Sequence, residues 1–178
     1  MYYLIIDVET TCCNQNSFPR DEMEIIEIGA VLCNPTFQVE AEFQSFVRPI
    51  VHPTLTEFCL NLTSIQQRDV DSADLFDAVV AKLKQFLSEY PSQSILFCSW
   101  GGFDKKMFHL DCQRHRISYP FSDQHCNLKA RFRQATGLPR QIGMAEALRQ
   151  SELTLEGTHH RGLDDARNIA RLLPICLG

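Results

Sequence analysis

The sequence lacks any apolar run near the roughly 18 residues that a membrane-spanning helix needs, so no membrane span is expected. Its beginning also lacks a basic stretch followed by a signal-like apolar segment, because Asp7 interrupts the first apolar run. We therefore expect a cytoplasmic protein. The formal net charge is −5, which argues against a protein that coats nucleic acid nonspecifically.

The eight cysteines include no CxxC pair, and only Cys12 and Cys13 are close in sequence. This spacing gives little support to the alternative of a zinc site. Cys33 and Cys98 lie in apolar runs typical of strands, where a thiol usually acts as a small buried hydrophobe. We interpret most of the cysteines as reduced core residues in a reducing compartment.

The chain has 178 residues, enough to bury a full core, and we expect a single domain over residues 1–178. Apolar and β-branched runs predict strands at residues 2–10, 24–33, 36–47, 94–98 and 125–127, with a loop over 11–22. Helical patterns cover residues 56–61, 72–87, 103–115, 128–135, 144–149 and 162–173, and Asp71 and Ser72 are the expected cap of the second. Strands followed by mixed strands and helices indicate an α/β layered sheet.

Basic residues are concentrated in one part of the chain. Between residues 105 and 140 there are eight lysines and arginines and only two acids, whereas the whole chain is negative. This segment is either a set of solvated helix faces or a basic rim that meets phosphates.

Two carboxylates, Asp7 and Glu9, interrupt the end of the first predicted strand. Residues two apart on a strand face the same side of the sheet, so these side chains are expected side by side. Adjacent carboxylates beside a core repel each other and lose hydration, and a bound divalent cation would compensate for both effects. The alternative is that the strand ends here and both acids face water.

Further acids and a histidine occur at other element ends. Asp104 follows a predicted strand and a double-glycine turn, where ligands gather in open α/β sheets, although it could simply be a helix-start residue. His160 precedes the last predicted helix and Asp165 lies in its first turns, so a helix start could direct both toward one point. The alternative is two surface histidines, His159 and His160, beside an acidic helix start.

Taken together, these residues resemble a known pattern. Asp7-x-Glu9-Thr, the mid-chain Asp104 and His160-x4-Asp165 resemble the DEDDh-type 3′→5′ exonucleases, which have the RNase-H-like fold. Five further segments resemble the exoribonuclease branch, which includes histone-messenger and small-RNA-trimming enzymes and bacterial relatives: residues 7–12, 26–31, 46–49, 58–63 and 159–169. Two departures stand out: Ser64 replaces the usual glycine of a Leu-Thr-Gly-Ile segment, and two glycines and Phe103 separate Trp100 from Asp104.

The resemblance implies a mixed five-stranded sheet flanked by helices in three layers, and a two-metal phosphodiester hydrolysis. Mg²⁺ or Mn²⁺ would be held by Asp7, Glu9, Asp104 and Asp165, with Asp7 as the bridging ligand. His160 would remove the proton of the attacking water, with His159 as the competing base. The products would be nucleoside 5′-monophosphates released from a free 3′-hydroxyl.

The resemblance also implies a pocket for the terminal nucleotide. Phe58 and Phe103 are the candidates for stacking on its base, with core packing as their alternative role. The backbone around Thr10 would reach the ribose hydroxyls, of which the 2′-OH marks RNA. The expected partner is single-stranded or 3′-overhanging nucleic acid, with RNA favoured. Two other functions stay open: a 3′→5′ DNA exonuclease, and a non-catalytic RNA-binding or regulatory module.

Overall fold

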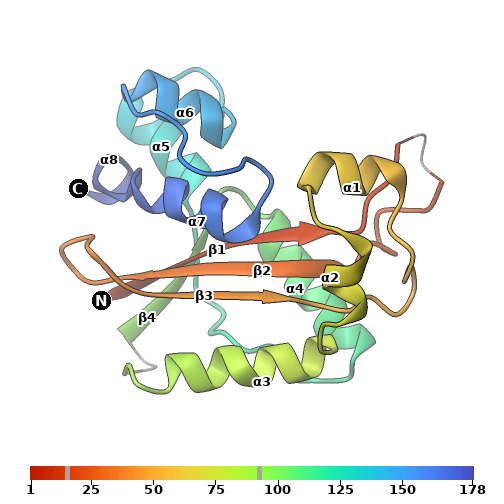
Figure 1. The fold of residues 1–178 in the computed structure, drawn as a ribbon. Helices are drawn as coiled ribbons and strands as arrows, with labels where there is room; N and C mark the ends of the chain where they lie inside the picture. The colour runs from red at the N-terminus through yellow and green to blue at the C-terminus, as the bar shows by residue number, and fades with distance from the viewer. Residues whose placement is uncertain (15–16, 92–93) are drawn as a thin grey trace.

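The computed structural model describes residues 1–14, 17–91 and 94–178. Its strands form one mixed sheet in the order β3-β2-β1-β4-β5 (Figure 1). β1 (Tyr2–Thr10) pairs antiparallel with β2 (Ile25–Cys33), and β2 pairs antiparallel with β3 (Val39–Phe46). On its other side β1 pairs parallel with β4 (Ile95–Ser99), which pairs parallel with β5 (His125–Asn127). β1 is therefore the central strand, and the prediction of a mixed five-stranded sheet is confirmed.

Helices cover both faces of this sheet (Figure 1). One face packs against α5 (Leu128–Thr136), α6 (Met144–Gln150), α7 (Gly162–Ala170) and α8 (Leu173–Leu177), and the other against α3 (Phe76–Leu87) and α4 (Phe103–Arg114). Along β1, Ile5 belongs to the core under α7, whereas Leu4 and Ile6 belong to the core over α3 and α4. Because side chains alternate along a strand, Asp7 and Glu9 face the side of α7.

A third, smaller core lies under α1 (Glu57–Thr63) and α2 (Gln67–Asp71), which sit at one end of the sheet (Figure 1). Ser64 ends α1 as its C-cap with a φ of 60°, in the left-handed region. Glycine is the residue that adopts this conformation most readily. The serine that stands here in place of the usual glycine therefore puts a side chain at a position whose backbone conformation favours glycine.

Three expectations about helices were wrong. α3 begins at Phe76 with Leu75 as its cap, because Gln66 and Asp69 form a capping box that starts the unpredicted helix α2 earlier. Ser72 is the C-cap of α2, where its hydroxyl bonds to the carbonyl of Arg68, so it is not a helix start. The last predicted helix divides into α7 and α8, and Pro174 stands in the first turn of α8, where a missing N–H is tolerated.

The third strand is shorter than expected, since it starts at Val39 instead of residue 36. The predicted loop over residues 11–22 contains no helix or strand in its described part, and residues 15–16 lie outside the described residues. Among the residues that are described, no helix is both long enough and apolar enough to cross a membrane.

Candidate active site

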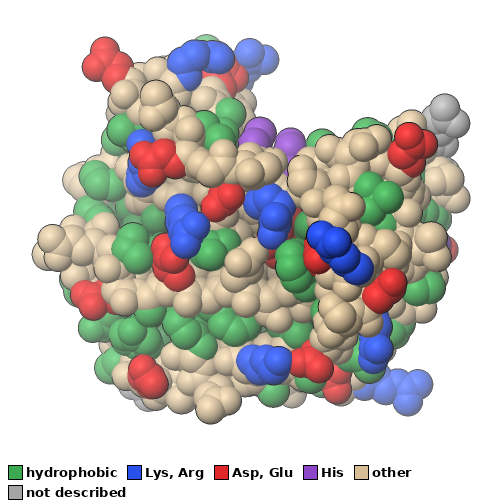
Figure 2. Space-filling view, in the orientation of Figure 1, with side chains coloured by type: hydrophobic (Ala, Val, Ile, Leu, Met, Phe, Trp, Pro, Cys, Tyr) green, Lys and Arg blue, Asp and Glu red, His purple; other side chains and the backbone are tan. Residues whose placement is uncertain are grey.

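A cavity of about 420 Å³ opens where β1 ends, between α1, α4 and the segment that leads into α7. Figure 2 shows this hollow between two raised parts of the surface, with histidine side chains exposed in it. Its lining includes most of the predicted site residues: Asp7, Glu9, Thr10, Phe103, Asp104, His160 and Asp165. Phe58 is the exception, because its side chain lies on α1, 38% exposed, and is not part of this lining.

The acids that the sequence singles out come together from three elements. Carboxylate oxygens of Asp7, Glu9 and Asp165 lie within 4.8 Å of one another. Asp104, from the first turn of α4, accepts a hydrogen bond of 3.1 Å from the backbone N–H of Val8, between the two β1 acids. Four carboxylates therefore surround one end of β1.

Burial raises the pKa of every one of these acids, and repulsion from neighbouring acids adds to it for Asp7 and Glu9. Burial is the largest cause for Asp7, and the charges of Asp104 and Glu9 add to it. The pKa of Glu9 rises to about 8, through burial and then the charge of Asp165. Burial raises the pKa of Asp104 to about 6 and also raises that of Asp165, although the hydrogen bond from His159 opposes the latter.

These residues fit a divalent cation. Ionised together, carboxylates this close repel one another, and a cation removes that repulsion. Carboxylate oxygens are also the ligands that Mg²⁺ and Mn²⁺ prefer.

The histidine loop approaches the same acids from α7. The Nδ1 atom of His159 lies 2.9 Å from Oδ2 of Asp165, and the backbone N–H of His160 donates to that same oxygen at 3.0 Å. The two imidazoles stack with their centroids 4.0 Å apart, and His160 has a φ of 63°. Burial, followed by the charge of His159, lowers the pKa of His160, so its imidazole is neutral near pH 7.

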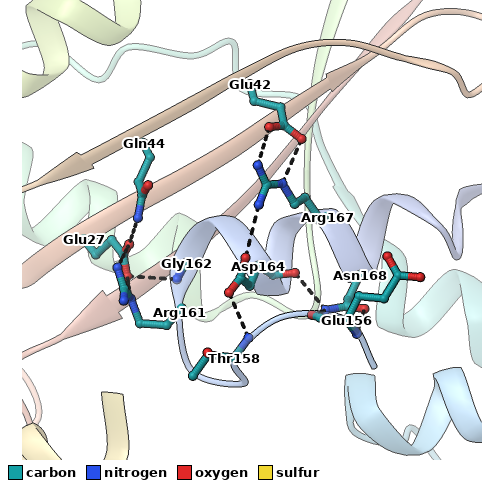
Figure 3. A network of polar contacts seen from close by, with 10 residues as sticks. All are labelled: Glu27, Glu42, Gln44, Glu156, Thr158, Arg161, Gly162, Asp164, Arg167 and Asn168. Carbon is teal, nitrogen blue, oxygen red and sulfur yellow. Dashed lines mark hydrogen bonds and ion pairs between the residues drawn. The ribbon is translucent and has the colours of Figure 1, made fainter. Parts of the chain in front are cut away.

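A polar network anchors this loop to the sheet (Figure 3). The fully buried carboxylate of Glu27 on β2 accepts two hydrogen bonds of 3.2 Å from Arg161 and one of 3.0 Å from the N–H of Gly162. Gln44 on β3 donates to the same carboxylate. The residue that follows His160 is therefore tied to β2, the neighbour of the central strand.

A second group in this network holds the other side of the loop (Figure 3). Arg167 on α7 donates to both carboxylate oxygens of Glu42 on β3, at 2.9 and 2.6 Å, and to Asp164 at 3.2 Å. Asp164 in turn accepts from the N–H of Thr158 at 2.8 Å.

Two glycines allow α7 to approach the sheet closely. A Cβ atom on Gly29 would lie 2.0 Å from the carbonyl carbon of Gly162, and one on Gly162 would lie 3.0 Å from the carbonyl oxygen of Asp7. Only glycine fits at Gly29, because backbone meets backbone there. This contact brings the start of α7, with Asp165, to the acids of β1.

The cavity also contains side chains that the motifs did not identify, chiefly Met23, Leu62, Trp100 and Met144. Trp100 is held in place by a hydrogen bond of 3.1 Å from its Nε1 to the carbonyl of Ile142. Trp100 could have been identified from the sequence as a site residue, because it is the only tryptophan and stands before the glycine turn that precedes Asp104. Leu62 lies in the segment 58–63 that resembles the exoribonuclease branch, but that resemblance assigned it no role. Met23 carried no signal, because it reaches the cavity only through the packing of its segment.

A family model described as "Exonuclease" matches residues 4–173. The curated "3'-5' exoribonuclease 1" of Homo sapiens is 36% identical over 180 residues, which cover 96% of this chain and 51% of that protein. "ERI1 exoribonuclease 3" of Mus musculus is 32% identical over 180 residues, covering 97% of this chain and 52% of that protein. The chain thus spans about half the length of these curated relatives.

Solved structures show the same architecture. The nuclease domain of 3'hExo, described as a DEDDh family member bound to rAMP, has a TM-score of 0.89 and 34% identity, covering 96% of this chain and 88% of that one. Cell-death related nuclease 4 has a TM-score of 0.85 and 25% identity, covering 97% of this chain and 62% of that one. The sheet and its flanking helices therefore form the RNase-H-like fold that the sequence motifs implied.

Proposed function

Because this chain belongs to the exonuclease family, we propose that it is a metal-dependent 3′→5′ exoribonuclease that releases nucleoside 5′-monophosphates from a free 3′-hydroxyl. The observation that carries the proposal is the gathering of four carboxylates and a histidine loop in one cavity. A chain whose only task was to fold would gain stability by replacing such acids, since each is held at a raised pKa. We propose that residues 1–178 act as the catalytic domain.

Asp7, Glu9, Asp104 and Asp165 would hold two divalent cations, Mg²⁺ or Mn²⁺. When bound, such ions stabilise the developing charge on the phosphate and lower the pKa of bound water. The backbone N–H of Val8 fixes Asp104, and the N–H of His160 fixes Asp165, so these carboxylates are oriented before any ligand arrives.

His160 would accept the proton of the attacking water. Its lowered pKa keeps the imidazole neutral near pH 7, as a general base requires. His159 is the alternative base. It is the weaker candidate, because its Nδ1 already contacts both carboxylate oxygens of Asp165.

Phe103 and Thr10 would bind the terminal nucleotide. Phe103 lines the cavity and is 45% exposed, so its ring is free to stack on a base, and Thr10 lines the cavity beside Glu9. Phe58 would contribute only if the substrate extends beyond the cavity lining. Phe103→Ala should therefore raise KM by about tenfold, since stacking contributes roughly 1–3 kcal/mol per base, and Phe58→Ala should raise it less.

The basic segment between residues 105 and 140 would contact upstream phosphates of a single-stranded or 3′-overhanging RNA. Arg114 does not belong to that surface, because it donates to Asp111 and to the carbonyls of Met23 and Asp21. RNA is favoured over DNA because the relatives at 36% and 32% identity are named exoribonucleases. A cytoplasmic location is proposed on the six buried thiols, which suit a reducing compartment.

A paired digestion tests the proposal. End-labelled RNA and DNA of one sequence would be incubated with the protein in Mg²⁺, in Mn²⁺ and in EDTA, beside an Asp7→Ala control. We expect a metal-dependent ladder from the 3′ end of RNA that the control lacks. Equal ladders on both substrates would indicate a general exonuclease, and RNA binding without any ladder would indicate a non-catalytic module.

A further inference from the structure

Two adjacent histidines meet one buried carboxylate at the start of α7. One ring nitrogen of His159, one of His160 and a carboxylate oxygen of Asp165 all lie within 4.8 Å of one another. The function proposed above uses His160 and Asp165, and it gives His159 only the place of an alternative base. The set of Asp7, Glu9 and Asp165 offers only oxygen atoms as ligands. His159 adds a second nitrogen ligand, beside that of His160, next to Asp165.

We propose that His159, His160 and Asp165 form a binding site for a divalent transition-metal ion such as Zn²⁺, and that an ion bound there inhibits the nuclease. Two imidazoles and one carboxylate, with a fourth position left for water, form a donor set that suits zinc. The neighbouring set of Asp7, Glu9 and Asp165 offers oxygen alone, which suits Mg²⁺. The nature of the donors therefore separates the two sites, although they share Asp165.

The donors need little rearrangement to bind an ion. The contact of 2.9 Å between His159 and Asp165 holds a proton that the metal would replace. The backbone bond from His160 to Asp165 and the anchoring of Arg161 on Glu27 fix the loop between the ligands. His159 has 41% of its side chain exposed, so an ion can enter from solvent.

The inhibitory part of the proposal rests on the proposed function. An ion on the ring nitrogen of His160 occupies the lone pair that would accept the proton of water. The same ion withdraws an oxygen of Asp165 from the carboxylate set. Both effects stop hydrolysis without displacing the substrate.

Cobalt binding tests the site without any activity measurement. Co²⁺ would be added to metal-free protein in millimolar Mg²⁺, and its visible absorption followed, since Co²⁺ takes the ligands of zinc and is coloured. We expect binding of one Co²⁺ that Zn²⁺ displaces and Mg²⁺ does not. His159→Asn should weaken it at least about tenfold, as the loss of a ligand exceeds the loss of a supporting contact.

Two variants serve as controls. His109→Asn removes an exposed histidine that stacks on Tyr119, outside the cavity lining, and should bind cobalt as the wild type does. Asp7→Asn removes a carboxylate that is no ligand of the proposed site and should retain the cobalt spectrum even if it is inactive. Cobalt that binds equally well to His159→Asn, or that Mg²⁺ displaces from the wild type, would overturn the site.

Zinc titration of RNA hydrolysis in excess Mg²⁺ tests the inhibition, with each variant normalised to its own rate without zinc. We expect the half-inhibiting zinc concentration to rise at least about tenfold in His159→Asn and to stay unchanged in His109→Asn. Cobalt binding without zinc inhibition of an active enzyme would refute the inhibitory role. A protein that cleaves no nucleic acid but binds cobalt as expected would refute the proposed function and leave the site intact.

Discussion

Replacing Arg161 with alanine should slow catalysis more than the loss of fold stability explains. Arg161 makes two hydrogen bonds of 3.2 Å to Glu27, whose carboxylate is fully buried, and its guanidinium lies 5.4 Å from the centre of the Phe46 ring. Hydrogen bonding to Glu27 also raises the pKa of Arg161, so its guanidinium stays charged. Among the described residues, the substitution leaves Glu27 with the donors of Gly162 and Gln44 alone.

The size of the effect follows from burial. Removing one partner of a buried ion pair costs about 3–5 kcal/mol, and the lower end applies because 26% of the Arg161 side chain is exposed. Arg161 directly follows His160, whose φ of 63° is unfavourable for a residue with a side chain. Once the anchor is gone, His160 can relax toward an ordinary conformation. A displacement of about 1 Å can slow a reaction by about a hundredfold, so we expect kcat to fall about 10- to 100-fold.

Arg167→Ala is the matched comparison. Arg167 also pairs through two bonds with a strand glutamate, Glu42, but 46% of its side chain is exposed. It should lose about 1 kcal/mol of stability and retain kcat. Arg161→Lys should lie between wild type and Arg161→Ala, since lysine keeps the charge and loses the two-point geometry.

The assay is single-turnover cleavage of a short RNA at saturating Mg²⁺, below the melting temperature of every variant, with thermal unfolding measured in parallel. KM should change little, because Arg161 does not line the cavity. Added methylguanidinium should restore part of the kcat of Arg161→Ala, a rescue that a purely structural defect would not show. Wild-type kcat in Arg161→Ala, or an equal loss in Arg167→Ala, would refute the reasoning.

Three further predictions concern the acids and the helix contact. Glu9→Gln should abolish RNA cleavage. It should also stabilise the metal-free protein at pH 8 by about 1 kcal/mol or more, as measured by chemical denaturation. The reason is that the pKa of Glu9 is raised to about 8, and a tenfold change in proton affinity corresponds to about 1.4 kcal/mol. The gain should shrink as the pH falls and vanish below about pH 4, where the unfolded wild type also holds that proton, and a gain that persists there would contradict it. The Mg²⁺ concentration for half-maximal cleavage should fall as pH rises from about 6 to about 8, since a cation must displace protons held by acids of raised pKa, and a flat profile would count against this. Gly29→Ala should destabilise the fold by about 3 kcal/mol or more and weaken Mg²⁺ binding in calorimetry, because the added Cβ would lie 2.0 Å from the carbonyl carbon of Gly162. Normal Mg²⁺ affinity in this variant would show that α7 did not move.

The sequence was sufficient to predict the β1 side of the site. Strand alternation alone put Asp7 and Glu9 on one face, and the structure places their oxygens within 4.8 Å of each other. Asp104 was also predictable, because a strand end and a glycine turn mark the mouth of an α/β sheet. The position of Phe58 relative to the cavity was not predictable from the sequence. Whether an aromatic side chain on a short amphipathic helix points toward a cavity depends on how α1 packs against the sheet.

The histidine loop was less predictable for a physical reason. The positions of His159 and His160 depend on contacts more than 130 residues away in the chain, between Glu27 and the start of α7, and no local pattern encodes them. The two glycines that permit that approach read, in sequence, as ordinary flexible residues. The charges of neighbouring acids raise the pKa of Asp7 and Glu9, so the folded chain must hold the acids together against their repulsion. Backbone packing at Gly29 and the hydrogen bonds to Glu27 supply that restraint. Residues that take no part in the chemistry of the site therefore offset the unfavourable free energy of holding its acids together.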